Sequence, residues 1–309
     1  MANESQFAAL LAATVKSSDT EEKIDLLIFR RVGLAIALLA RKIGATPNVI
    51  TVLGILSGIA ASRFFYYDDV TLNVAGILLL ALGSSLDSAD GQLARMTNNC
   101  SRIGRTLDGI SGYLWFIGIY LHLYFRFLPE GNILAYTGLY ALAIVSHSFQ
   151  SAMADYYRNA HLYFVFGKNK SEFDSYETLA EQYQANKSGM NFIEKFFALL
   201  YINYTRKQEA LTKNFQRFIR LAAEKFGQGL PQNIRSEFRG MSRPLQKYCN
   251  GLTLNARFFA IYLTLFFKNI YIFLLFETVV LNIVLIYLIS KHEAGSAELN
   301  QKMIEAQGR

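Results

Sequence analysis

Long stretches of the chain carry no charged residue, and their lengths predict helices that cross a membrane. Four such stretches follow one another, at 43–62, 70–86, 109–125 and 131–154, with 20, 17, 17 and 24 residues. A hydrocarbon core of ~30 Å needs about 20 helical residues, within a range of roughly 17–25. All four stretches therefore have the length of a membrane span.

Two further apolar stretches, 252–267 and 270–290, lie near the C-terminus. Arg257 and Glu277 interrupt them, and these two residues can pair if both face the interior of a helix bundle. The sequence thus predicts an all-α polytopic membrane protein with about six transmembrane helices. Buried helices of a soluble protein are the alternative, but such helices rarely continue so far without a charge.

The segment 24–43 alternates apolar residues with Arg30, Arg31, Arg41 and Lys42. This pattern is typical of a helix that lies along the inner membrane surface with its basic residues toward lipid phosphates. A transmembrane reading fits less well because two arginines lie in its middle. We therefore predict an N-terminal interfacial helix.

Charge in the connecting segments predicts the orientation. The segments 30–42 and 95–105 are basic, whereas 66–69 holds two aspartates and no Lys or Arg. Because short basic loops stay in the cytoplasm, both termini and the segment 87–108 are expected on the cytoplasmic side.

Composition agrees with a membrane protein: 52% of the residues are hydrophobic and 18% are charged, against about 25% charged in soluble domains. The two cysteines are too few for a disulfide framework or a cysteine-rich metal site. The formal net charge of +7 resides in 158–250, which holds fifteen Lys or Arg and eight Asp or Glu.

This basic segment predicts a cytoplasmic helical insertion whose positive face meets anionic lipid headgroups. Nucleic-acid binding is the alternative for a basic stretch, and the nearby membrane tether disfavours it. The expected domains are 1–45 (N-terminal, interfacial), 46–157 (spans one to four), 158–250 (insertion), 251–290 (spans five and six) and 291–309 (tail).

Acidic residues gather at the ends of two neighbouring predicted spans. Asp87 and Asp90 are three residues apart and share a helix face. The next span begins with Gly104, Asp108 and Gly112, which are four apart and also share a face. Two antiparallel helices could therefore bring three carboxylates together at the membrane boundary.

Carboxylates this close repel one another unless a cation lies between them. Mg²⁺ or Mn²⁺ is the natural occupant, since hard divalent ions prefer oxygen ligands. The small residues Gly91 and Ala94 leave room for a bulky ligand, and Arg95 offers a planar fork for a phosphate. Metal, phosphate and membrane together indicate phosphoryl-group transfer on a lipid.

The pattern Asp87-x-x-Asp90-Gly91-x-x-Ala94-Arg95, eight residues, Gly104-x-x-x-Asp108 resembles the signature of the CDP-alcohol phosphatidyltransferases. Thr46-Pro47-Asn48-x-x-Thr51 resembles the entry to the first span of that family. The motif extends over roughly residues 46 to 112, and the six-span plan extends the resemblance over most of the chain. The basic insertion is not part of the family core.

The resemblance implies a role for each matching residue. Asp87, Asp90 and Asp108 would hold two divalent ions that bind the pyrophosphate of a CDP-linked lipid or CDP-alcohol. The cytidine diphosphate site would be lined by Gly91, Ala94, Arg95, Gly104, Asn48, Thr51 and Ser101. An alcohol or lipid acceptor would attack the phosphorus distal to cytidine, and CMP would leave. Membrane lipids and a homodimer are expected as partners, and nucleic acid is not.

The sequence departs from the family at one position. The family pattern ends in a fourth Asp, which acts as the general base, and here that position is Gly112. General-base catalysis is typically worth 10²–10⁴-fold. Either another residue serves, the acceptor needs little help, or turnover is lost. Asp155 is a candidate replacement, and His147 is a weaker one. The expected catalytic residues are thus Asp108 and Asp155.

Two other functions stay open. A non-catalytic homologue could bind the nucleotide-lipid or scaffold a lipid-synthesis complex, a reading that Gly112 supports. A transporter would need carboxylates near the membrane midplane, whereas these lie at span ends. The acceptor, and whether the lipid is donor or acceptor, are left open by the sequence.

Overall fold

The computed structural model describes residues 2–14, 17–99, 102–167, 173–227 and 229–305. Across these ranges every regular element is a helix and no strand occurs, which confirms the all-α prediction. The chain divides into two compact units. The first is Met1–Ile144 with Phe259–Leu274, and the second is Val145–Phe258 with Leu275–Arg309.

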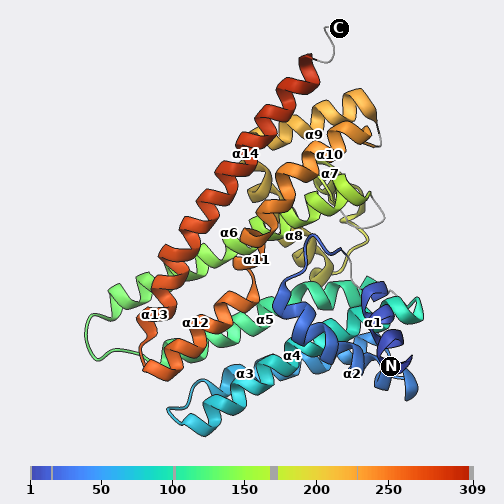
Figure 1. The fold of residues 1–309 in the computed structure, drawn as a ribbon. Helices are drawn as coiled ribbons and strands as arrows, with labels where there is room; N and C mark the ends of the chain where they lie inside the picture. Colours follow the sequence, from blue (N-terminus) through green and yellow to red (C-terminus); the bar gives the residue numbers. More distant parts are fainter. Residues whose placement is uncertain (1, 15–16, 100–101, 168–172, 228, 306–309) are drawn as a thin grey trace. The chain divides into compact units, whose positions relative to one another are not determined.

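The first unit contains the segments that carry the motif. Its elements are α1 (Ala2–Thr14), a π-helical turn (Asp25–Phe29), α2 (Arg30–Lys42), α3 (Pro47–Phe64), α4 (Val70–Thr97) and α5 (Arg102–Arg126), coloured blue to teal in Figure 1. Most of α13 (Ile270–Leu275), coloured orange, also belongs to this unit. Two further helices, α6 (Ile133–Phe166) and α12 (Leu254–Phe267), contribute to both units.

Local sequence explains where α3 begins and where α4 begins and ends. Pro47 occupies the first turn of α3, where its missing N–H is not needed. The side chain of Asp69 caps α4 by accepting a hydrogen bond from the Leu72 N–H at 2.8 Å. Asn98 ends α4 in the left-handed conformation, with φ of 52°.

Glycines let α3, α4 and α5 approach one another closely around Trp115. A Cβ on Gly58 would lie 2.3 Å from the Trp115 ring, and one on Gly83 would lie 3.2 Å from it. The indole of α5 therefore fills the space that glycine leaves on both neighbouring helices, and Trp115 is 1% exposed. Close approach at small residues is typical of packed membrane helices.

Asp68 joins three chain segments at one end of this unit. Its carboxylate accepts hydrogen bonds from Arg126, at the end of α5, and from Lys268, between α12 and α13, both at 3.0 Å. The bond from Lys268 is the main reason why the pKa of Asp68 lies below its usual value. The segments that follow α3 and α12 thus meet the end of α5.

The second unit combines the basic segment with α6 and the last helix. It adds α7 (Tyr176–Asn186), α8 (Phe192–Ala210), α9 (Lys213–Phe226), α10 (Gln232–Ser242), a 3₁₀ turn (Arg243–Leu245), α11 (Gln246–Gly251), a π-helical turn (Phe276–Val280) and α14 (Leu281–Glu305). The basic segment is therefore helical in its described residues. Its placement in the cytoplasm and the domain boundaries stay predictions.

Aromatic rings form the core of the second unit. The rings of Phe215, Phe218 and Phe238 stack on one another, with centroids 5.3 to 6.1 Å apart. His292 of α14 stacks on Tyr157 of α6 at 3.9 Å. The basic segment thus shares one hydrophobic core with α6 and α14 instead of forming a core of its own.

Three helices in the described part of the chain are long and apolar enough to cross a membrane: Pro47–Phe64, Val70–Thr97 and Ile270–Glu305. The last is continuous through α13, the π-helical turn and α14. The other three predicted spans lie in α5, α6 and α12, of which α12 has only 14 residues, or about 21 Å at 1.5 Å per residue. These findings support a membrane protein, and six spans stay a prediction.

Cys249 of α11 is fully buried, and this burial raises the pKa of its thiol to about 12. Because the thiolate is the reactive form, we expect no alkylation of Cys249 by iodoacetamide in the folded protein at neutral pH. Mass spectrometry of the Cys249 peptide before and after denaturation measures this. Alkylation of the folded protein as fast as of the denatured protein would contradict the burial.

Candidate functional site

Asp90 and Thr51 hold α3 and α4 together inside the motif. The Thr51 hydroxyl donates a hydrogen bond to Oδ2 of Asp90 at 2.5 Å, and its oxygen also lies 3.1 Å from the Pro47 carbonyl. Both side chains are buried, with Asp90 6% and Thr51 4% exposed. The motif threonine at the entry to α3 therefore fixes one of the predicted metal-binding carboxylates.

Asp87 lies one turn earlier on α4 and turns toward α5. The Ser111 hydroxyl lies 3.4 Å from Oδ1 of Asp87, in the orientation of a long hydrogen bond. Ser111 is itself 6% exposed. The contact shows that the face of α5 that begins at Gly104 meets α4 at the acidic motif.

Gly91 makes room for the guanidinium of Arg95. A Cβ added to Gly91 would lie 3.3 Å from Nη1 and 3.4 Å from Nη2 of Arg95. The Arg95 side chain therefore returns along α4 toward the turn that carries Asp90. A planar cation in this position is suited to a phosphate bound beside the carboxylates.

The structure describes some of the remaining motif residues and not others. Asn48 lies in the first turn of α3, three residues before Thr51, and is half-buried. Ala94 and Gly104 are also half-buried. Ser101 lies outside the described residues. Asp108 belongs to α5, one turn before Ser111, but its side chain lies outside the description.

The chemistry of the acidic residues fits a divalent cation, since Asp87 and Asp90 offer carboxylate oxygens from one helix face. Among the side chains that the structure describes, no three His, Cys, Asp or Glu form a group that could hold a metal ion. The third expected ligand, Asp108, is outside that set. The two-ion site therefore stays a prediction.

Gly112 leaves space where the family has its fourth Asp, because a Cβ added there meets none of the described atoms within 4 Å. The two proposed replacements belong to the second unit, whereas the motif belongs to the first. Asp155 is half-buried on α6. Its role as a base stays a prediction.

His147 has another partner, since its Nδ1 lies 3.6 Å from Oε1 of Glu277. The predicted pairing of Arg257 with Glu277 is confirmed: Nε of Arg257 donates to Oε1 of Glu277 at 2.8 Å. Nη2 of Arg257 also donates to Oε1 of Gln150 at 2.7 Å. Sequence reasoning missed Gln150, whose uncharged side chain does not interrupt the apolar run of α6.

Asn282 also belongs to the group of polar side chains around Arg257 and Glu277, and the sequence did not indicate it. Its Oδ1 accepts a hydrogen bond from Nε2 of Gln150 at 2.8 Å, and its Nδ2 donates to Oγ of Ser146 at 2.9 Å. The group therefore connects α6, α12 and the last helix through Gln150, Arg257 and Glu277, which are almost fully buried, and Asn282, which is half-buried. It lies within the second unit and contains no residue of the motif.

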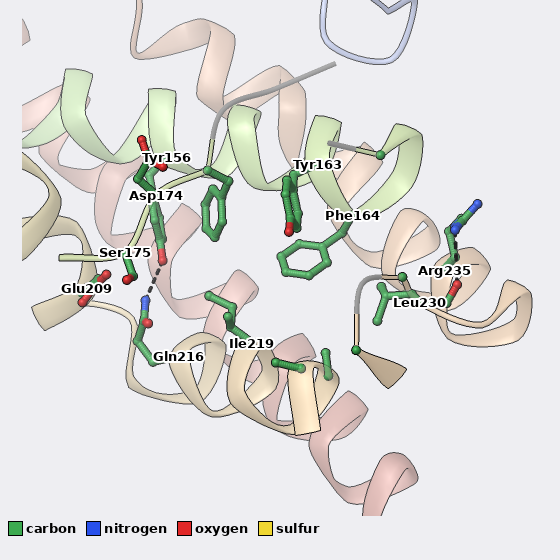
Figure 2. Close-up of a pocket in the computed structure, with 16 residues that line it drawn as sticks. Tyr156, Tyr163, Phe164, Asp174, Ser175, Glu209, Gln216, Ile219, Leu230 and Arg235 are labelled. Carbon is green, nitrogen blue, oxygen red and sulfur yellow. Dashed lines mark hydrogen bonds between the residues drawn. The ribbon is translucent and has the colours of Figure 1, made fainter. Parts of the chain in front are cut away.

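A cavity of about 170 Å³ also lies in the second unit. Figure 2 shows Tyr163, Phe164 and Ile219 around its middle, with the Gln216 side chain bonded to the Tyr156 hydroxyl at 2.5 Å. Burial is the main cause that raises the pKa of Glu209 at its edge. The cavity is lined by no residue of the acidic motif.

Comparison with known proteins agrees with the motif. Residues 44–172 match the CDP-alcohol phosphatidyltransferase family. A curated relative, an archaetidylinositol phosphate synthase of Pyrococcus horikoshii, is 44% identical over 78 residues, which are 25% of this chain and 38% of the relative. The matched region thus spans well under half of the length of that relative. No solved structure matches the chain.

Proposed function

We propose that the CDP-alcohol phosphatidyltransferase domain formed by residues 44–172 transfers a phosphatidyl or phospho-alcohol group from a CDP-linked donor, with release of CMP, in phospholipid synthesis. The observation that carries this proposal is the acidic motif on adjoining helices. Thr51 on α3 and Ser111 on α5 each lie against one of its carboxylates on α4. The relative's name makes an inositol phosphate the first acceptor to test.

Asp87, Asp90 and Asp108 would hold two Mg²⁺ or Mn²⁺ ions. When bound, such ions neutralise charge on the entering and leaving oxygens of a phosphoryl transfer. The residues of the chain then have distinct tasks. Thr51 holds the buried Asp90 in one orientation, and Arg95 binds a donor phosphate beside Gly91.

The chain must also take a proton from the acceptor hydroxyl. Gly112 cannot do this because it has no side chain, so we assign the task to Asp155. A carboxylate that accepts the proton as the hydroxyl attacks phosphorus supplies general-base catalysis. In the alternative function, the domain binds the nucleotide-lipid without turnover; the missing fourth Asp favours it.

Asp87→Asn should abolish the metal-dependent binding of a CDP-lipid, because it removes one charged oxygen ligand. The measurement is Mn²⁺-dependent retention of radiolabelled CDP-lipid by the purified full chain, together with CMP release when an acceptor is added. Glu181→Gln is the control, since it changes an exposed carboxylate to an amide outside the motif.

Wild-type binding by Asp87→Asn would contradict the metal site. Metal-dependent binding by the wild-type chain without CMP release, with inositol phosphate, glycerol phosphate and serine each supplied as acceptor, would favour the non-catalytic alternative.

A further inference from the structure

Helix α8 presents an apolar face to its surroundings. Four large apolar side chains on it are exposed: Phe192 by 83%, Phe196 by 51%, Leu200 by 50% and Leu199 by 44%. Their spacing is i, i+4, i+7 and i+8, which places all four on one side of the helix.

The opposite side of α8 is anchored to the second unit. Thr205 is 3% and Gln208 is 4% exposed, and Nε2 of Gln208 donates to the carbonyl of Ala152 on α6 at 2.8 Å. Because this anchor fixes the rotation of the helix, the apolar side must face away from the core of its unit. The exposed face is therefore a property of the folded unit and not of a loosely attached helix.

Basic residues flank the apolar face. Lys195, Arg206 and Lys207 lie on or beside the same side of α8. The acidic residue of the first turn, Glu194, is used in a capping box with Asn191. The surrounding segment 158–250 carries a net charge of +7. Apolar residues bordered by Lys and Arg are typical of helices that lie in the membrane interface.

Other occupants of this face fit less well. Helix α8 is not among the described helices that are apolar enough to span a membrane. A second copy of the chain would bring an equally basic surface against this one, and like charges oppose such contact. An anionic bilayer surface satisfies both the apolar side chains and the positive charge.

We propose that α8 lies in the headgroup region of a bilayer that contains anionic lipid, with Phe192, Phe196, Leu199 and Leu200 inserted at the acyl boundary. The face would attach the basic segment to the membrane at a point separate in sequence from the spans. This inference does not depend on the reaction of the motif.

The test uses the full chain in nanodiscs of phosphatidylcholine, with and without phosphatidylglycerol. A nitroxide is attached at Phe196→Cys, or independently at Leu199→Cys, in a Cys100→Ser background that keeps the buried Cys249. The control position is Ser236→Cys on the exposed side of α10. Power-saturation electron paramagnetic resonance then compares collisions with lipid-soluble oxygen and with a water-soluble nickel chelate.

We expect oxygen to dominate at 196 and 199 and the nickel chelate to dominate at 236. Omission of phosphatidylglycerol should shift 196 and 199 toward the nickel chelate. Equal accessibility to the nickel chelate at 196, 199 and 236 would overturn the insertion. Exclusion of both reagents with spin–spin broadening would show a second copy on this face and also overturn it. If the accessibilities at 196 and 199 were the same with and without phosphatidylglycerol, the role of anionic lipid would be overturned.

Discussion

The variant Asp155→Asn should release CMP 10²–10⁴-fold more slowly than the wild-type chain, the range that general-base catalysis supplies. The physical reason is that the amide cannot accept the proton of the acceptor hydroxyl, and Gly112 offers no alternative. Binding of the CDP-linked donor should be retained, because Asp155 is not among the proposed metal ligands. Single-turnover CMP release and donor binding, measured on the same preparation, separate the two effects.

Gly112→Asp provides the complementary experiment. A Cβ at Gly112 meets none of the described atoms within 4 Å, so the first atom of the family side chain can be introduced without a clash with them. In the wild-type background it should be neutral or harmful, whereas in the Asp155→Asn background it should restore part of the rate. Glu181→Gln, on exposed α7, is the control. A large gain from Gly112→Asp alone would show that the native site lacks a base and would contradict the role of Asp155.

Arg257→Met should destabilise the protein by about 3–5 kcal/mol, the usual cost of removing one partner of a buried ion pair. Arg257 is 1% and Glu277 is 0% exposed, so the remaining carboxylate would stay buried without its cation. Gln150 would lose the hydrogen bond that it accepts from Arg257. Unfolding of the purified chain in mixed micelles, titrated with dodecyl sulfate and followed by circular dichroism, measures the free energy change.

The double variant Arg257→Met/Glu277→Leu should recover a large part of this loss, because it removes both charges together. Arg220→Met on α9 is the control, since Arg220 is exposed. If Arg257→Met were as stable as the double variant, the ion pair would not be the source of the destabilisation.

Sequence patterns predicted the helical class and the acidic motif because both depend on short-range spacing. Asp87 and Asp90 share a face wherever α4 is helical, so their proximity follows from three-residue spacing alone. The partners Thr51 and Ser111 are 39 and 24 residues away from them. Thr51 was included through the family resemblance, whereas nothing in the spacing pointed to Ser111.

The packing of the second unit was harder to predict from the sequence, because it also depends on contacts between distant residues. Its core joins α6, the basic segment and α14, and the stacked His292 and Tyr157 lie 135 residues apart. Charge counting described 158–250 as one basic block but could not show which side of each helix is covered. The apolar face of α8 became visible only when the Gln208 anchor fixed the rotation of the helix.

Trp115 is the single tryptophan of the chain, and it lies where α5 meets Gly58 and Gly83. The intrinsic indole fluorescence of the protein therefore originates at one contact inside the first unit. Emission from this contact is an optical reporter of how tightly α3, α4 and α5 are joined. The same emission carries no direct signal from the aromatic core of the second unit, so its change on denaturation follows the unfolding of the first unit.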